Sequence, residues 1–236
     1  MACLRYSKDS GYLARLGICN VPTSSLARES DLVFLTKAGP EIGVASTKAC
    51  TTQLFGLLML TLVIGRRHGL SQVAENSINE SLRALPGSLD AVMKLEPSII
   101  KMAEHFDQKE HALFLGRGIH YPIAMEGALK LKEVSYIHAE GYAAGEMKHG
   151  PIALIDSNMA TLALAPKNQL YDKMLGNILE VKARDGMVAA ILTEGDGELG
   201  SRVDVATYIP PVPESLMPMV LTIPLQLLAY YVALTK

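Results

Sequence analysis

The 236-residue sequence contains no tryptophan and only four phenylalanines. Proteins that hold single-stranded nucleic acid stack bases on aromatic side chains, and this chain offers few of them. Its formal net charge is −2, from 22 Lys and Arg against 24 Asp and Glu. A basic patch is the electrostatic signature of nucleic-acid and anionic-membrane binding. The composition therefore argues against both kinds of partner.

Cysteine is scarce as well, and Cys3, Cys19 and Cys50 are the only three. Their number is odd, their spacing is wide and no Cys-x-x-Cys pair occurs, so a disulfide framework and a zinc site are both disfavoured. Reduced thiols are typical of cytosolic proteins, and residues 1–10 lack the apolar core of a signal peptide. We therefore expect a cytoplasmic protein without a bound metal.

Charged residues make up 19% of the chain and hydrophobic residues 49%, which is enough apolar material for a sizeable core. Two stretches, 49–65 and 216–235, carry no charge, and 20 apolar residues can span a bilayer. Two prolines and a glutamine in the second stretch, without flanking basic clusters, favour a buried core or interface helix over a membrane span. We expect both stretches to be buried, with no membrane association.

Short apolar runs alternate with helical patterns. Strands are expected at 13–21, 31–36, 111–118, 161–166, 187–196 and 203–210, and helices at 43–69, 121–140, 168–186 and 214–235. Residues 71–106 are more polar and are expected to be helical, with breaks near Pro86 and Pro97. Alternating strands and helices predict an α/β fold with a parallel sheet, and continuous apolar strands are typical of such sheets.

A weak internal repeat links the two halves. Each half has a strand, a Pro-Glu pair and a long apolar helix with Gln-Leu: Pro40-Glu41 with Gln53-Leu54, and Pro213-Glu214 with Gln226-Leu227. Two further strand-helix units precede the second copy only. Either two apolar helices are similar by chance, or the chain holds two related domains, the first without its own first half.

One helical face carries charges in an otherwise apolar region. Glu126, Lys130 and Glu133 are spaced i, i+4 and i+7 and share a face, whereas Lys132 lies on another side. One interpretation is a solvated stripe stabilised by a few tenths of a kcal/mol. The other is an acid–base group, in which a lysine and a carboxylate lie within reach of each other.

Three further stretches leave two interpretations open. Residues 141–156 form a glycine-rich loop whose His149 is either a surface or hydrogen-bonding residue or an acid–base group. The Gly-Arg-Gly turn at 116–118 and the GVAST segment at 43–47 each precede a helix. Backbone N–H groups at a helix start suit an anion such as phosphate, and a plain N-cap explains Ser46 and Thr47 equally well.

Together, three segments resemble the isomerase half of the glutamine–fructose-6-phosphate aminotransferase family: residues 28–54, 115–156 and 223–234. The resemblance covers nearly the whole chain. It implies two SIS (sugar isomerase) domains, each a flavodoxin-like, doubly wound parallel sheet between helices. Residues 1–70 correspond to the C-terminal part of a first SIS domain truncated at its N-terminus. Residues 71–106 are a helical connection, and 107–236 are the second SIS domain.

The resemblance also implies an activity. Family members combine fructose 6-phosphate with ammonia from glutamine to give glucosamine 6-phosphate, which feeds UDP-N-acetylglucosamine synthesis, with no metal or organic cofactor. The family's catalytic glutamate, which moves a proton between C1 and C2 of the sugar, matches Glu133. The lysine and glutamate before it match Lys130 and Glu126. The family's ring-opening histidine, supplied by the neighbouring subunit of a homodimer, matches His149.

The substrate contacts are matched only in part. Two residues that contact the sugar phosphate match Val44 and Ser46. The family's Ser/Thr-rich phosphate loop is expected before residue 4 and its imine-forming lysine after Lys236, and Cys3 does not match the nucleophile of the glutaminase domain. We therefore expect this chain alone to be inactive. The alternatives are a non-catalytic module that binds a phosphosugar, and a truncated product without function.

Overall fold

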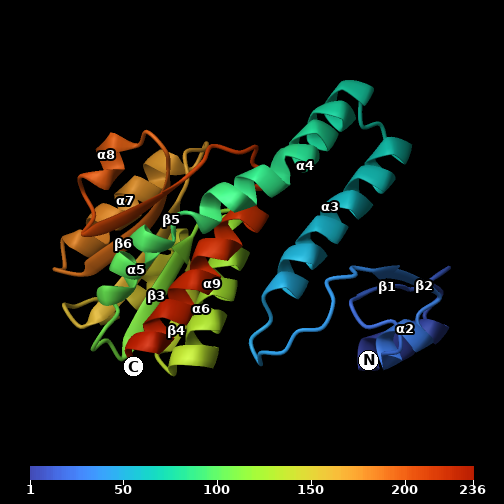
Figure 1. The fold of residues 1–236 in the computed structure, drawn as a ribbon, viewed down its shortest axis with the longest axis horizontal. Coiled ribbons are helices and arrows are strands. Elements are labelled where there is room, and N and C mark those ends of the chain that lie inside the picture. The colour runs from blue at the N-terminus through green and yellow to red at the C-terminus, as the bar shows by residue number, and fades with distance from the viewer. The chain divides into compact units, whose positions relative to one another are not determined.

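The computed structural model describes all 236 residues and divides into two compact units, Met1–Asn76 and Ser77–Lys236. Figure 1 shows the elements of both. Helix α4 (Gln72–Met93) runs across the boundary between them. The predicted division at residues 70 and 106 into functional domains stays a prediction.

The second unit is built on one five-stranded sheet. Its strands are β3 (His111–Gly116), β4 (His138–Ala143), β5 (Met159–Ala165), β6 (Met187–Thr193) and β7 (Val205–Ile209). They lie in the order β4-β3-β5-β6-β7, and every pairing is parallel. In sequence order this is 2-1-3-4-5, the flavodoxin-like arrangement. The predicted α/β fold with a doubly wound parallel sheet is confirmed.

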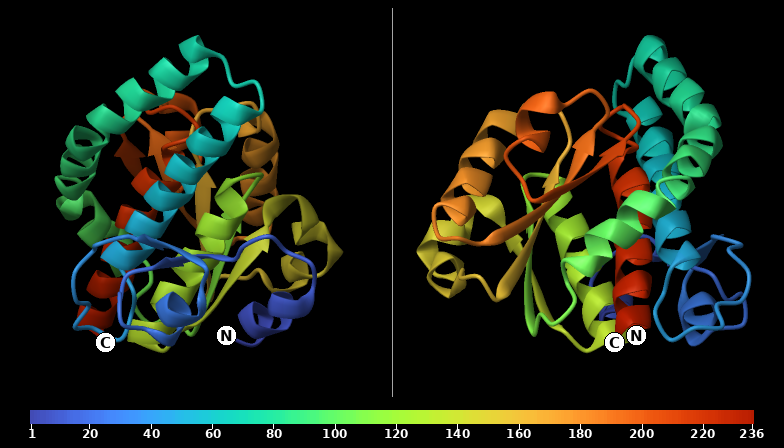
Figure 2. Two further views of the ribbon diagram at one scale, coloured as in Figure 1. Left: turned by 90° about the vertical axis from the view of Figure 1, so that its right-hand side faces the viewer. Right: turned by 60° about the vertical axis from the view of Figure 1, so that its left-hand side comes forward.

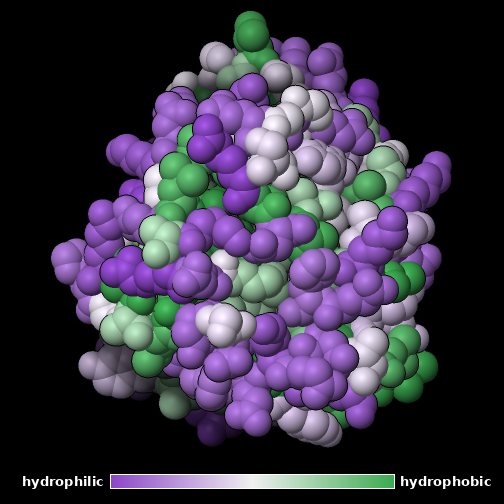
Figure 3. Space-filling model, turned by 90° about the vertical axis from the view of Figure 1, so that its left-hand side faces the viewer, coloured by the Kyte–Doolittle hydropathy of each residue, from purple (hydrophilic) through white to green (hydrophobic).

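Helices cover both faces of this sheet. On one face α6 (His120–Ser135) and α9 (Met217–Thr235) pack together, with α5 (Glu96–Glu104) beside α9. On the other lie α7 (Tyr171–Lys182) and the short α8 (Gly197–Gly200). Figure 2 shows the two layers. In Figure 3, hydrophilic side chains cover most of the face that α7 and α8 form, as expected for the outer surface of amphipathic helices.

Two glycines hold α6 close to its neighbours. A Cβ atom on Gly127 would lie 2.9 Å from Leu225 of α9 and 3.0 Å from Phe114 of β3. A Cβ atom on Gly141 of β4 would lie 2.4 Å from the Cα atom of Met125. Glycine permits this close approach of backbones, so the sequence fixes the helix that carries Glu126, Lys130 and Glu133 tightly against the sheet.

The first unit contains one two-stranded parallel sheet of β1 (Leu16–Cys19) and β2 (Leu32–Leu35). Its helices are α1 (Ala2–Tyr6), α2 (Ser25–Glu29) and α3 (Lys48–Arg67), with a 3₁₀ turn, η1, at Ser7–Asp9.

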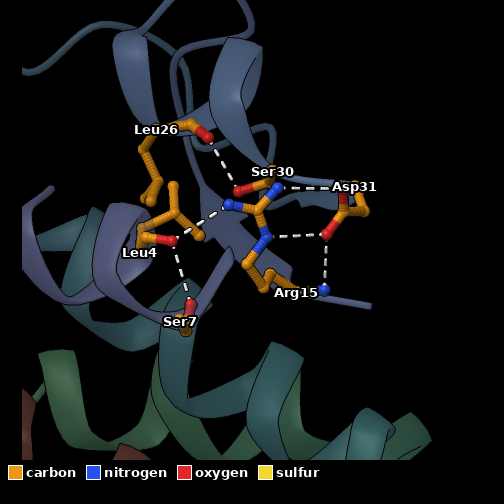
Figure 4. A network of polar contacts seen from close by, with 6 residues as sticks. All are labelled: Leu4, Ser7, Arg15, Leu26, Ser30 and Asp31. Atoms are coloured by element: carbon orange, nitrogen blue, oxygen red, sulfur yellow. Dashed lines mark hydrogen bonds and ion pairs between the residues drawn. The ribbon is translucent and has the colours of Figure 1, made fainter. Parts of the chain in front are cut away.

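A polar network ties the start of β2 to α1 (Figure 4). The Arg15 guanidinium donates to both carboxylate oxygens of Asp31, at 2.8 and 3.0 Å, and to the Leu4 carbonyl at 3.0 Å. Ser30 donates to the carbonyl of Leu26 at 2.7 Å. The side-chain hydrogen bond from Arg15, with a backbone N–H bond from the same residue, lowers the pKa of Asp31 to about 2.

This shift predicts how the stability of the first unit depends on pH. The folded-state pKa of Asp31 lies below its usual 3.8. The contribution of Asp31 to the free energy of unfolding is therefore complete above pH 3.8 and is lost as pH falls through about 2. We expect Asp31→Asn to lower the Tm at pH 7 and the difference from the parent chain to vanish near pH 2. Thermal unfolding across this pH range tests it, with the exposed Asp90→Asn as control. A Tm difference that does not change with pH would contradict the prediction.

Several predicted boundaries are wrong. The helix expected at 121–140 ends at Ser135, because Tyr136 adopts a left-handed conformation with φ of 61°. Residues 138–143 form β4 instead; as an edge strand it is half exposed and lacks the continuous apolar run of the central strands. Helix α3 begins at Lys48, five residues later than expected. Pro86 lies inside α4 and does not end it, although a proline in a helix interior removes an N–H donor and crowds the preceding turn.

The two uncharged stretches differ in burial. By length and composition, α3 and α9 could each cross a membrane. Within the chain, 56% of the apolar window of α9 is buried, as in the core helix of a soluble protein, whereas only 17% of that of α3 is. Residues 216–235 are therefore mostly buried, as expected, whereas 49–65 are largely exposed within this chain. For 49–65, burial in an interface stays a prediction.

Candidate active site

The charged face of α6 forms one compact cluster around Lys130. Its Nζ atom lies 2.6 Å from Glu133 Oε2 and 3.6 Å from Glu126 Oε1. The Lys130 side chain is only 4% exposed, against 30% for Glu133 and 20% for Glu126. A solvated stripe does not describe this lysine. We call Glu126, Lys130 and Glu133 the α6 cluster.

Burial decides what the α6 cluster can do. A buried ammonium is costly unless carboxylates surround it, and here two of them do. The same ammonium separates two like charges and fixes the Glu133 side chain through a charge-assisted hydrogen bond. The Glu133 side chain is 30% exposed and stays accessible from solvent. A positioned carboxylate with an accessible oxygen can accept a proton and return it, which is the work of a general acid–base group.

His149 lies at the end of the 3₁₀ helix η2 (Ala144–His149). Its side chain is 74% exposed, and its ion-pair partner is Glu146, with Nε2 3.9 Å from Oε2. Ala144 and Met147 of the same segment are fully buried and anchor it to the core. The structure thus presents His149 outward and does not join it to the α6 cluster.

Sequence reasoning missed the contacts that hold the η2 segment. Lys148 Nζ lies 2.7 Å from Glu180 of α7, and Arg117 donates to Asn177 of the same helix at 2.7 Å. A Cβ atom on Gly145 would lie 3.2 Å from the Arg117 guanidinium, which therefore packs against this glycine. These pairs are 32 and 60 residues apart, and no local pattern marks them.

Val44 and Ser46 lie in the first unit, in the bend between β2 and α3. Val44 is fully exposed. The helix start that follows already holds an anion, because the Glu41 carboxylate accepts from the backbone N–H groups of Thr47 at 2.8 Å and Ala49 at 3.1 Å. Thr47 occupies the N-cap position without a side-chain capping bond. Neither open interpretation of GVAST foresaw this arrangement.

The environment of Glu41 favours its charged form. Burial acts to raise the pKa of this carboxyl, but the hydrogen bonds from the Thr47 and Ala49 backbone and from the Ser46 hydroxyl outweigh it, so the pKa is lowered. Positive charge at a helix N-terminus acts in the same direction. Any external anion reaching this helix start has to compete with, or bind beside, Glu41.

The Gly-Arg-Gly turn leads into α6 with a very close backbone contact. A Cβ atom on Gly116 would lie 2.3 Å from the carbonyl oxygen of His120, so glycine is required there. His120 is buried, and its Nε2 atom has no hydrogen-bond partner. Burial lowers the pKa of His120, against the opposing charge of Glu214, which favours the neutral ring.

The comparisons with known proteins agree with these features. The profile of the SIS domain matches residues 2–63 and 105–236. Glutamine–fructose-6-phosphate aminotransferase (isomerizing) of Shewanella oneidensis is 53% identical over 239 residues, covering 100% of this chain and 39% of that protein. The same enzyme of Yersinia pestis is 54% identical over 236 residues, with the same coverage.

A solved structure shares the fold. The C-terminal domain of glucosamine-fructose-6-phosphate aminotransferase from Francisella tularensis matches with a TM-score of 0.94 and 47% identity, covering 99% of this chain and 66% of that one. The chain therefore spans about two fifths of the length of the curated relatives that it matches. The resemblance drawn from the sequence is confirmed, and the chain belongs to the SIS domain family.

Proposed function

We propose that this chain is the isomerase part of an enzyme that makes glucosamine 6-phosphate from fructose 6-phosphate and ammonia released from glutamine. The observation that carries the proposal is the α6 cluster, in which a buried lysine holds Glu133 as an accessible carboxylate. The identity of 53% to enzymes of that name, across the whole chain, supports it. The pathway is the cytoplasmic supply of UDP-N-acetylglucosamine.

The proposed chemistry uses residues of this chain for proton movement. Glu133 takes a proton from one of the two adjacent sugar carbons, C1 and C2, and returns it to the other, so the isomerisation is redox-neutral. Lys130 holds that carboxylate in place and balances its charge, and Glu126 shares the ammonium. Ser46 and Val44 contact the sugar phosphate beside Glu41.

His149 is proposed to act in ring opening at the site of a second copy in a homodimer. Its outward presentation at 74% exposure, on a segment anchored by buried Ala144 and Met147, supports this assignment. Sedimentation of the chain with and without fructose 6-phosphate tests it. A chain that stays monomeric at all concentrations would count against the shared site.

The chain alone is expected not to make glucosamine 6-phosphate from glutamine and fructose 6-phosphate. It spans 39% of the length of the matched relatives, and the printed enzyme name belongs to those full-length proteins. Product analysis of the purified chain tests this, and detection of glucosamine 6-phosphate would contradict it. The matched positive control is a chimera in which this chain replaces the corresponding 39% of the Shewanella oneidensis relative.

A further inference from the structure

Two imidazole rings meet at the end of the sheet where strands β3 and β4 begin. The turn from β3 to α6 lies at the other end of the sheet. His111 begins β3 and His138 begins β4, and the two are direct partners in the parallel register. Their Nδ1 atoms lie 3.3 Å apart and their rings meet edge to face at 86°. The pairing of the strands, not a flexible loop, sets this geometry. Neither ring belongs to the α6 cluster or to the η2 segment.

The separation of the two nitrogens matches that of ligands on one metal ion. Zinc binds histidine nitrogen at about 2.0–2.1 Å in a tetrahedral arrangement, which places two such nitrogens about 3.3 Å apart. In the metal-free chain one Nδ1 donates a proton to the lone pair of the other. A zinc ion takes the place of that shared proton, which moves to Nε2 of the donor ring, so both rings stay neutral.

A carboxylate stands behind one ring. Glu140 lies two residues further along β4 and on the same side of the strand, with Oε1 3.8 Å from His138 Nε2. A carboxylate on this side favours the tautomer with the proton on Nε2 and leaves the Nδ1 lone pair free. Carboxylates hydrogen-bonded to a metal-bound histidine are a recurrent feature of zinc sites. At 3.8 Å, Glu140 makes an electrostatic contact with the His138 ring and has to move closer to accept that hydrogen bond.

The surroundings favour a cation. The two rings line a cleft of about 580 Å³ whose charged lining residues, besides the histidines, are all acidic: Glu110, Glu140 and Asp156. No third His, Cys, Asp or Glu completes a set of three around one point, so water fills the other coordination positions. The sequence led us to expect no metal, both from the spacing of the cysteines and from the family resemblance, and a histidine site lies outside the first of these arguments.

We propose that His111 and His138 bind a zinc ion through their Nδ1 atoms, with Glu140 as a positioning residue for His138. The site is separate from the proposed isomerase residues and does not depend on that function. A divalent ion here joins the first residues of β3 and β4, which are otherwise held by the strand pairing and by the contact between the two rings.

Calorimetric titration of the whole chain with zinc chloride tests the proposal. We expect one zinc equivalent to be lost in His111→Ala and in His138→Ala, and affinity to fall about tenfold in Glu140→Gln. His68→Ala, an exposed histidine of the first unit, is the matched control and should bind as the parent does. A His111→Ala/His138→Ala double variant that binds as much zinc as the parent overturns the proposal.

A second measurement distinguishes coordination from loose association. Long-range ¹H–¹⁵N spectra of the imidazole rings should show zinc-dependent shifts of the Nδ1 resonances of both His111 and His138, and none for His68. Both substituted residues are exposed at the start of their strands, so the variants should keep the fold, which circular dichroism checks. Zinc-dependent shifts on Nε2 alone would also overturn the proposal.

Discussion

Replacing Lys130 with methionine is expected to lower the unfolding free energy of the second unit by about 3 kcal/mol. The side chain is 96% buried, and its ammonium lies 2.6 Å from Glu133 and 3.6 Å from Glu126. Methionine keeps the length and fills the space, but it leaves two like charges on one half-buried helix face. Removing one partner of a buried ion pair costs about 3–5 kcal/mol. Urea unfolding followed by circular dichroism measures the change.

Lys132→Met is the matched control. It sits on the same helix two residues away, but its side chain is exposed. Exposed substitutions of this kind change stability by about 0.5 kcal/mol or less. Equal effects of the two substitutions would show that the α6 cluster contributes nothing specific and that the solvated stripe is the better description. A larger loss in Lys130→Met alone supports the cluster.

Glu133→Gln is expected to reduce isomerase turnover by about 10²- to 10⁴-fold, the usual contribution of a positioned acid–base group. The amide keeps the shape of the side chain and its contact with Lys130 Nζ, but it cannot accept a proton. The assay uses the chimera with the Shewanella oneidensis relative and follows glucosamine 6-phosphate with ammonia supplied directly. Turnover should fall while the Kd for fructose 6-phosphate changes little.

Glu104→Gln, an exposed carboxylate on α5, is the control for Glu133→Gln and should leave turnover unchanged. Full activity in Glu133→Gln would exclude this residue as the proton carrier. If no variant nor the parent chimera turns over, but all bind fructose 6-phosphate equally, a non-catalytic phosphosugar-binding module is the better description of the chain. Turnover by the parent chimera therefore distinguishes an isomerase from a module that only binds the sugar phosphate.

Local sequence signals predicted most of the elements. The central strands β5 and β6 are buried on both faces and therefore form continuous apolar runs in the sequence. Helix α9 carries no charge, and 56% of its apolar window is buried. Edge strand β4 was missed because HAEGYA is half polar. The left-handed φ of Tyr136 ends α6 at Ser135. This leaves residues 138–143 free to form the strand.

The site could be predicted in part for a similar reason. Spacing alone placed Glu126, Lys130 and Glu133 on one face, since three and four residues make one helical turn. It could not show that Lys130 is buried, because burial depends on Gly127 and Gly141, which let α6 lie close to β3, β4 and α9. It also could not show that Glu41 occupies the start of α3, since a bend of the chain brings that carboxylate back to the helix.

The sequence by itself determined the α/β class with a parallel sheet, the family and the charged face of α6, because each depends on periodicity or on a contiguous motif. The tertiary structure alone decided which charges are buried and which distant residues meet. His111 and His138 are 27 residues apart and become neighbours only through the parallel register of β3 and β4. Contacts of that kind are set by strand pairing, and strand pairing leaves no local mark in the sequence.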